Sequence, residues 1–327
     1  MNKKVKTLLI VLGVILLVVA GVAYRYYRSV DDYLASITTT QSSETQPDES
    51  KEEPIKFGSE PMVLYISGSD SRTTVSATAR SDVNIVAVVN PVTAKILLVN
   101  IPRDYYVQLH GTTGTKDKLT HAGVYGIDMS KTTIEDLLDI KIDETLKVGF
   151  EAVTTLVDTL DGLDLDIDQD FTSKTDGGCK FTAGVQHVDG RCALAFARER
   201  KSYASGDRHR GENQQQVISK ILKKIAEPTY LLKLPEILKS AEGLFETSLT
   251  KDELIDLIRY EMKNRTNWSV ESIALDGTGS YAPTYSMGSR ELYVMIPDEA
   301  TISAAQEKIA TYLQTEQKDD LADNSVD

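Results

Sequence analysis

The sequence has few of the residues that build zinc sites or basic surfaces. Its 327 residues include two cysteines and four histidines, which do not fall at the spacing of a zinc finger. Lys and Arg number 36 against 49 Asp and Glu, which gives a formal net charge of -13 and a pI near 4.9. A nucleic-acid-binding domain needs a basic face, and neither a helix-turn-helix signal nor an internal repeat is present. These absences argue against a zinc protein and against a DNA-binding regulator.

The composition is typical of a globular protein, and polar segments lie on both sides of the region expected to fold. The hydrophobic content is 41% and the charged content 26%. Residues 38–57 and the last 14 residues, 314–327, are polar, acidic and nearly free of large apolar side chains, so they bury too little surface to fold. We therefore expect one folded domain at residues 58–313, preceded by a flexible linker at 28–57 and followed by a disordered acidic tail at 314–327.

The N-terminus carries a long apolar run. Basic residues within segment 1–6 precede uninterrupted apolar sequence at 7–23, and a Tyr- and Arg-rich group follows at 24–28. The run is near the short end of what crosses a bilayer, and aromatic and cationic residues favour the membrane interface. It is longer than the core of about 7–15 residues in a cleaved signal peptide, which is the alternative interpretation. We predict a cytoplasmic segment at 1–6, one transmembrane anchor at 7–27, and an extracellular linker and domain at the cell membrane.

The folded region mixes strand and helix patterns. Short apolar or alternating runs predict strands at 62–66, 83–89, 95–101, 163–167, 268–275 and 292–296, the second and third forming a hairpin. Helical spacing and two capping boxes, Thr132 with Glu135 and Thr250 with Glu253, predict helices starting near 132 and spanning 148–160, 215–225, 250–264 and 298–313. A polar, glycine-rich loop is expected between residues 275 and 292. The pattern predicts a three-layer α/β fold, in which helices flank a central mixed sheet.

Residues 191–216 hold five of the chain's thirteen arginines, although the protein is acidic. The guanidinium group matches phosphate oxygens two at a time. Arg198 and Arg200 share a face if the chain is extended there, and Arg210 and Gln214 share a face of a helix that begins near Arg210. We interpret this stretch as the binding segment for a phosphorylated ligand; a solvated charged loop is the alternative.

Three further clusters of Asp and Arg lie where predicted strands begin or end, at 70–72, 80–82 and 101–104. Strand ends present polar groups to ligands in α/β proteins, although one such cluster alone is more often a local salt bridge or turn cap. Phosphoryl transfer needs cations around the oxygens and a hard metal ion held by carboxylates. The candidate cations are Arg103, Arg198, Arg200 and Arg210; the candidate ligands of Mg²⁺ are Asp70 and Asp82; the candidate bases are Asp82 and Asp207.

Six motifs between residues 63 and 225 occur together and in order: SGSDSR, ARSDVNIVAVVNP, IPRDYYV, DKLTHAGVYG, DGRCALAFARER and GDRHRGENQQQVI. With these motifs the chain resembles the LytR-CpsA-Psr family of membrane-anchored cell-wall transferases. The Gly-Glu-Asn-Gln form at 211–214 is similar to the CpsA-like branch, and Asn213 stands where many members carry Arg. Lys118 and His121 match the family's DKxxHA segment, and we expect His121 to be structural.

The resemblance implies a membrane-anchored extracellular phosphotransferase. It would move a glycopolymer, such as a capsular polysaccharide or a teichoic acid, from a polyprenyl-pyrophosphate carrier to a peptidoglycan hydroxyl, with Mg²⁺ or Mn²⁺ as cofactor. The alternatives are a polyprenyl-phosphate-binding regulator or assembly factor without transfer activity, and a pyrophosphatase of the same lipid. The residues that match the family's phosphate-binding positions are Arg80, Arg103, Arg198, Arg200, Arg210 and Gln214; metal-associated positions match Asp70 and Asp82; catalytic roles are expected for Arg103, Asp82, Arg198 and Asp207.

Two features stay open at the level of sequence. Cys179 and Cys192 flank a turn-rich segment, which makes them a disulfide candidate in an outward-facing domain, with two buried free thiols as the alternative. The lipid carrier would need an apolar groove. The helices at 148–160 and 215–225 are candidates to line it, but their apolar faces are equally those of an ordinary core.

Overall fold

A computed structural model describes residues 59–69, 78–174, 178–203, 206–225, 227–231, 233, 237, 239–240, 243–264 and 267–315. The predicted anchor at 7–27, the linker at 28–57, Asp70 and most of the acidic tail lie outside these residues. Within the described ranges, no helix combines the length and the apolar character needed to cross a membrane.

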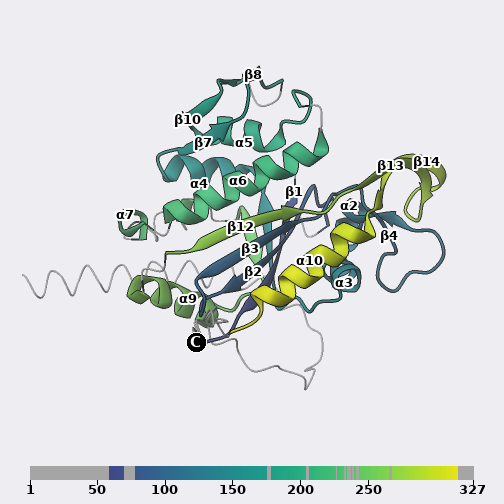
Figure 1. Cartoon of the computed structure of the whole chain (residues 1–327), viewed down its shortest axis with the longest axis horizontal. Coiled ribbons are helices and arrows are strands. Elements are labelled where there is room, and N and C mark those ends of the chain that lie inside the picture. The colour runs from purple at the N-terminus through teal and green to yellow at the C-terminus, as the bar shows by residue number, and fades with distance from the viewer. Residues whose placement is uncertain are drawn as a thin grey trace, which may run out of the picture.

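A six-stranded mixed sheet forms the centre of the molecule (Figure 1). Its strands, in spatial order, are β11 (Phe245–Thr247), β6 (Glu144–Gly149), β1 (Met62–Ser69), β2 (Val83–Asn90), β3 (Lys95–Asn100) and β12 (Ser269–Ala274). β1 is parallel to β6 and β3 is parallel to β12, whereas β2 is antiparallel to both of its neighbours. The strands β1, β3, β6 and β12 therefore all end at the same edge of the sheet. The predicted hairpin of β2 and β3 is confirmed.

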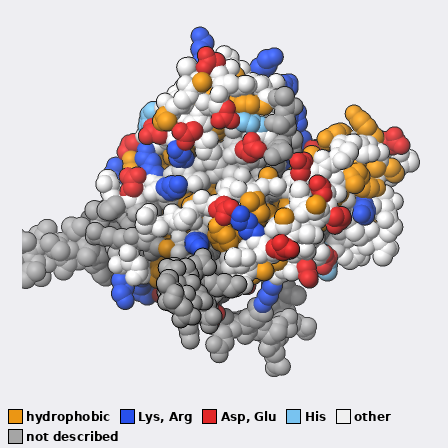
Figure 2. Space-filling model, in the orientation of Figure 1, with side chains coloured by type: hydrophobic (Ala, Val, Ile, Leu, Met, Phe, Trp, Pro, Cys, Tyr) orange, Lys and Arg blue, Asp and Glu red, His pale blue; other side chains and the backbone are white. Residues whose placement is uncertain are grey.

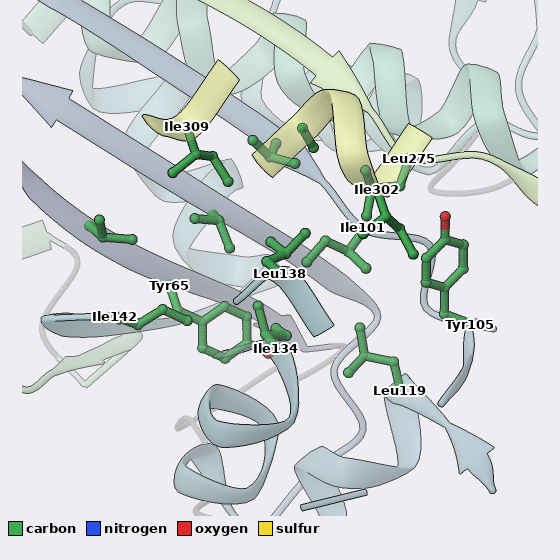
Figure 3. Close-up of a cluster of buried hydrophobic side chains, with 14 of the residues drawn as sticks. Tyr65, Ile101, Tyr105, Leu119, Ile134, Leu138, Ile142, Leu275, Ile302 and Ile309 are labelled. Carbon is green, nitrogen blue, oxygen red and sulfur yellow. The ribbon is translucent and has the colours of Figure 1, made fainter. Parts of the chain in front are cut away.

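Helices cover both faces of this sheet, as the α/β prediction requires. Strand residues alternate between the faces: Tyr65 belongs to the core cluster on one face, and Leu64 packs with the apolar cluster on the other. On the first face, α3 (Ile127–Leu138) and α10 (Glu299–Tyr312) pack on the sheet, and Figure 3 shows Ile134 of α3 beside Tyr65 of β1. On the opposite face, α6 (Asp207–Ile225) lies over β3 and β12.

A second apolar cluster joins α6 to a smaller layer above it. This layer contains α4 (Phe150–Thr159), α5 (Gly190–Arg198) and the antiparallel pair β7 (Leu163–Ile167) and β10 (Gly184–Val188). Cys179 and Cys192 form a disulfide within it, with their Cα atoms 5.7 Å apart, which selects the disulfide over two free thiols. The shorter elements are α2 (Leu119–Ala122), η2 (Gly123–Tyr125), α7 (Pro228–Leu231), β4 (Tyr106–Val107), β5 (Asp117–Lys118), β8 (Phe171–Thr172) and β9 (Lys180–Phe181).

The predicted loop between residues 275 and 292 is wrong except for residue 276 and a short turn at residues 285–287. The chain instead forms a long hairpin of β13 (Gly277–Thr284) and β14 (Gly288–Pro297), which projects from the end of β12 (Figure 1). Its glycines suggested a loop, but they serve close packing in a strand. A Cβ atom on Gly279 would lie 3.1 Å from the ring of Tyr293, so glycine lets that ring lie across the strand.

Helix ends show where local signals succeed and fail. The box of Thr250 and Glu253 caps α9 (Lys251–Asn264), because the Thr250 N–H donates to the Glu253 carboxylate and the Glu253 N–H to the Thr250 hydroxyl. The box predicted at Thr132 and Glu135 is wrong, since α3 already begins at Ile127. Within α3, the Thr132 hydroxyl donates to the carbonyl of Asp128. The helix α5 was not predicted at all.

Candidate active site

Polar side chains collect at the edge where four strands of the sheet end. Asp82 immediately precedes β2, Arg103 lies in the loop after β3, and Asp276 follows β12. A narrow cleft opens at this edge. Its lining is Asp82, Val83, Asn84, Asn100, Ile101, Pro102, Arg103, Arg210, Gly211, Gln214, Ala274, Leu275, Asp276 and Met295. The topology of the sheet thus brings together groups that are as much as two hundred residues apart in the chain.

A chain of charged contacts runs along one wall of the cleft. An Arg103 guanidinium nitrogen donates to Asp82 Oδ1 at 2.7 Å, and Arg103 Nε lies 3.5 Å from Asp104 Oδ2. Asp104 in turn accepts a hydrogen bond of 2.9 Å from Lys118. The Arg103 and Asp82 side chains keep 30% and 22% of their surface exposed, so both reach solvent in the cleft. A phosphate entering here would meet a guanidinium group that Asp82 and Asp104 already hold in place.

The first turns of α6 form the opposite wall. Arg210 and Gln214 both line the cleft, as expected for residues four apart on a helix. Gly211 lets the helix approach β3, because a Cβ atom there would lie 2.9 Å from the Asn100 side-chain nitrogen. That nitrogen donates to the Gly211 carbonyl at 3.3 Å, and Gln215 donates to the carbonyl of Ile273 at 2.6 Å. These contacts with the sheet fix the position of α6 and therefore the positions of Arg210 and Gln214 in the cleft.

The other predicted phosphate-binding arginines lie outside the cleft lining. Arg198 is the last residue of α5, and its guanidinium carbon lies 5.1 Å from the centre of the Phe150 ring. Arg200 and Arg80 are exposed. The α5 end is nevertheless tied to α6, since the buried Asn213 side chain donates to the carbonyl of Phe196 at 3.0 Å.

The carboxylates that line the cleft are Asp82, which was predicted, and Asp276, which was not. Asp70 lies outside the described residues, and Asp207 is the first residue of α6. Asp276 lines the cleft, and its side chain accepts the Gly277 N–H at 2.8 Å. It follows a predicted strand directly, so the strand-end rule that selected Asp82 and Arg103 would also have selected Asp276.

His121 anchors the hairpin to the domain. Its Nδ1 lies 2.6 Å from Asp117 Oδ1 and 2.9 Å from the Ser286 hydroxyl, and Asp117 Oδ2 accepts the Ser286 N–H. Burial alone would raise the pKa of Asp117, but hydrogen bonds from His121 and Ser286 lower it below its ordinary value. This buried contact joins α2 and β5 to the β13–β14 turn, as a structural role for His121 requires.

The chain is similar to known proteins over most of its length. Residues 30–309 match the LytR_cpsA_psr family. The chain is 32% identical over 304 residues, 91% of its length and 94% of the relative's, to the Polyisoprenyl-teichoic acid--peptidoglycan teichoic acid transferase TagU of Bacillus mycoides. The crystal structure of TagV from Bacillus subtilis is 27% identical with a TM-score of 0.65, covering 78% of this chain and 98% of that one. A structure of TagT bound to LIIa-WTA has 25% identity and a TM-score of 0.64, with coverage of 85% and 99%.

A cleft that combines guanidinium and carboxylate groups at the carboxyl edge of an α/β sheet is suited to a phosphate-bearing ligand. The chain belongs to the LytR-CpsA-Psr family. Both the resemblance drawn from the six motifs and the predicted transferase class are confirmed.

Proposed function

We propose that this protein transfers a teichoic-acid-like glycopolymer from a polyprenyl-pyrophosphate carrier to a hydroxyl group of peptidoglycan. The observation that carries the proposal is the cleft that Asp82, Arg103, Arg210 and Gln214 line together. The names of the family relatives supply the two substrates, since TagU and TagV are teichoic acid transferases that act on peptidoglycan. Because a polyprenyl carrier lies in the bilayer, this function favours a domain held at the outer face of the cell membrane by residues 7–27.

In the transfer step, an acceptor hydroxyl oxygen attacks the phosphorus that bears the glycopolymer. A new O–P bond forms, and the bond from that phosphorus to the bridging oxygen breaks, so polyprenyl phosphate leaves with the electron pair. Arg103 and Arg210 pair with the phosphate oxygens, whose charge must be neutralised in the transition state. The hydroxyl proton passes to a carboxylate, for which Asp82 and Asp276 are the candidates that line the cleft.

The cleft suits Mg²⁺ by the chemistry of its donors. Asp82 and Asp276 offer carboxylate oxygens and Asn100 an amide oxygen, and Mg²⁺ prefers such ligands. It is usually held by one or two carboxylates together with substrate phosphates, so a dedicated protein cage is not needed. Asp82 would be one ligand of the ion, in which case Asp276 is the carboxylate that accepts the proton, and Asp70 would be the second ligand by family resemblance. When bound, Mg²⁺ would neutralise charge on the pyrophosphate.

An apolar surface next to the cleft fits the lipid part of the carrier. On the sheet face that looks toward α6, Leu64, Ile66 and Val83 are half-buried and so keep apolar surface exposed, while Ile85 and Leu98 beside them are fully buried. Val83 also lines the cleft, so the apolar face and the charged site are continuous. Ile218 of α6 packs on this surface, whereas α4 packs into the separate cluster around the disulfide. We infer that the helix predicted at 215–225 borders the lipid and the one at 148–160 does not.

The test uses the full-length chain in detergent with a polyprenyl-pyrophosphate-linked teichoic acid glycan and purified peptidoglycan, with Mg²⁺ or with EDTA. We expect a glycan-phosphate-peptidoglycan adduct by mass spectrometry that requires Mg²⁺. Arg103→Ala should abolish it. The matched control is Arg259→Ala, because Arg259 is exposed on α9 and pairs with Asp256, three residues before it in the same helix.

The alternatives give different products in the same experiment. Binding of the lipid without an adduct would support a binding protein without transfer activity. Release of polyprenyl phosphate without an adduct would support hydrolysis of the pyrophosphate. Loss of activity in both Arg103→Ala and Arg259→Ala would show that the assay responds to the loss of any surface cation, and would not support a role for the cleft.

A further inference from the structure

The β13–β14 hairpin presents an exposed aromatic face that the proposed phosphoryl chemistry does not use. Tyr281 opposes Tyr293 in the hairpin register, and their ring centres are 6.0 Å apart. Their exposed fractions are 69% and 42%, and Tyr125 and Tyr285 nearby are each 48% exposed. Figure 2 shows hydrophobic side chains gathered at this end of the molecule. An exposed cluster of large rings is costly in water and points to a binding surface.

This face leads directly into the cleft. Side chains alternate along a strand, so Met295 and Tyr293 of β14 lie on the same side of the hairpin, with Tyr281 opposite Tyr293. Met295 lines the cleft, and β13 begins immediately after the cleft residue Asp276. Lys118, the end of the charged chain from Asp82 and Arg103, lies 6.0 Å from the Tyr293 ring centre. The aromatic face is therefore an extension of the candidate active site.

The hairpin is fixed rather than loosely attached. The Met295 N–H donates to the Asp104 carbonyl at 2.7 Å, and the Tyr106 hydroxyl donates to the Pro283 carbonyl at 2.8 Å. At the turn, the Ser286 N–H donates to the buried Asp117 and the Tyr285 N–H to the Lys116 carbonyl. A surface held at both ends loses little freedom when a ligand binds to it.

The position of the hairpin matches that of the acceptor in the proposed transfer. The attacking and leaving oxygens of a phosphoryl transfer lie roughly in line, on opposite sides of the phosphorus. The apolar sheet face proposed for the lipid lies toward α6, and Arg210 and Gln214 form that side of the cleft. Asp276 and Met295, at the root of the hairpin, line the same cleft. The proposed lipid face and the hairpin therefore border the cleft through different residues, which leaves the hairpin for the acceptor.

The chemistry of the face favours a neutral glycan over a membrane. All four exposed rings are tyrosines, which offer a flat apolar face together with a hydroxyl that hydrogen-bonds. The apolar C–H faces of pyranose rings stack on such surfaces, and the sugar hydroxyls meet the tyrosine hydroxyls. An anionic membrane would need a strongly basic surround, but the chain has a net charge of -13, and Glu291 stands beside Arg290 in β14, which leaves Lys118 as the cation at the Tyr293 ring.

We propose that the tyrosine face of the β13–β14 hairpin is the acceptor subsite, on which sugar rings of a peptidoglycan glycan strand stack and present a hydroxyl to the cleft. This assignment rests on the proposed transferase function for its acceptor. The hairpin then sets the affinity for the acceptor glycan, while the Asp82–Arg103 cleft sets the affinity for the phosphorylated donor.

The test measures acceptor dependence with the full-length chain in detergent. For Tyr281→Ala, we expect the KM for soluble peptidoglycan glycan strands to rise by at least about tenfold, which corresponds to about 1.4 kcal/mol of lost binding. The kcat and the affinity for the lipid-linked donor should stay unchanged. Tyr281→Phe, which keeps the ring, should retain most of the acceptor affinity. Val185→Ala is the matched control, because Val185 is 71% exposed on β10, outside the hairpin.

A second measurement separates this proposal from the transferase function. Binding of the glycan strands is measured by calorimetry without any lipid donor, and binding to phosphatidylglycerol vesicles is measured in parallel. Weaker glycan binding by Tyr281→Ala supports the subsite even if no transfer occurs, in which case only the transferase function fails. Unchanged glycan binding and KM in Tyr281→Ala, or a loss confined to vesicle binding, would overturn the subsite.

Discussion

The disulfide gives a prediction whose size follows from the structure. Cys179 and Cys192 are 13 positions apart, so the bridge closes a loop of 14 residues counting both ends. In the chain-entropy account, closing a loop of this length removes unfolded-state entropy worth about 3 kcal/mol at 25 °C. For a domain of this size, about 2–4 °C of melting temperature corresponds to 1 kcal/mol, so loss of the bridge should lower the melting temperature by ~6–12 °C.

Loss of the disulfide should loosen mainly the layer that contains α5 and its last residue, Arg198. Cys179 is 4% exposed within the apolar cluster of α4, α5 and β7, and the Cys192 N–H donates to Asp189, which caps the start of α5. Phe181, two residues after Cys179, packs at 5.7 Å from the ring of Phe196 in α5. Opening the bridge frees the segment that covers this helix. We therefore expect faster backbone hydrogen exchange in residues 190–198 and little change in the central sheet.

The assay is thermal unfolding of the oxidised chain, the chain with reductant, and a double variant with both cysteines changed to Ser. The reduced chain and the double variant should melt at the same, lower temperature, and reductant should not affect the double variant. Thiol labelling under native conditions must first show no free thiol. Two labelled thiols before reduction, or an unchanged melting temperature once both are labelled, would refute the reasoning.

Three further predictions concern charge and capping. Asp82→Ala should weaken Mg²⁺ binding by about tenfold or more, since one of the one or two carboxylates that usually hold this ion is lost; unchanged calorimetric affinity would contradict the assignment. The pKa of Asp117 is lowered in the fold, so the unfolded chain binds more protons around its ordinary value of about 3.9, and stability rises with pH there. The advantage of the wild type over Asp117→Asn, measured by urea unfolding, should therefore be full above that pH and shrink as pH falls; an advantage that grew on acidification would disprove the sign. Thr250→Ala should lower the free energy of unfolding by ~1 kcal/mol, because it removes the cap of α9. Thr250→Ser keeps a hydroxyl and should retain most of the wild-type stability in the same urea unfolding assay.

Much of the fold follows from local sequence, and the errors have local causes. The buried strands β1, β2 and β3 are short apolar runs bounded by polar residues, and the box at Thr250 joins two groups three residues apart. The helix α5 was not predicted, because its nine residues span too few turns to give a clear helical period. The strand β13 was missed because Gly277 and Gly279 signal a loop, whereas they are needed for contacts with β14, which only the folded hairpin reveals.

The candidate site shows a different limit, because it depends on strand order rather than on any one segment. Asp82 and Arg103 were predicted individually, and their contact requires only the hairpin of β2 and β3, which the sequence also predicts. Arg210 and Asp276 enter the same cleft because β12 pairs in parallel with β3 and α6 packs over both, and no local pattern specifies these pairings. The β13–β14 hairpin follows β12 directly, so its position also depends on the pairing of β12 with β3. A sequence that placed β12 elsewhere would keep every motif that marks the family and lose the surface on which the acceptor is proposed to bind.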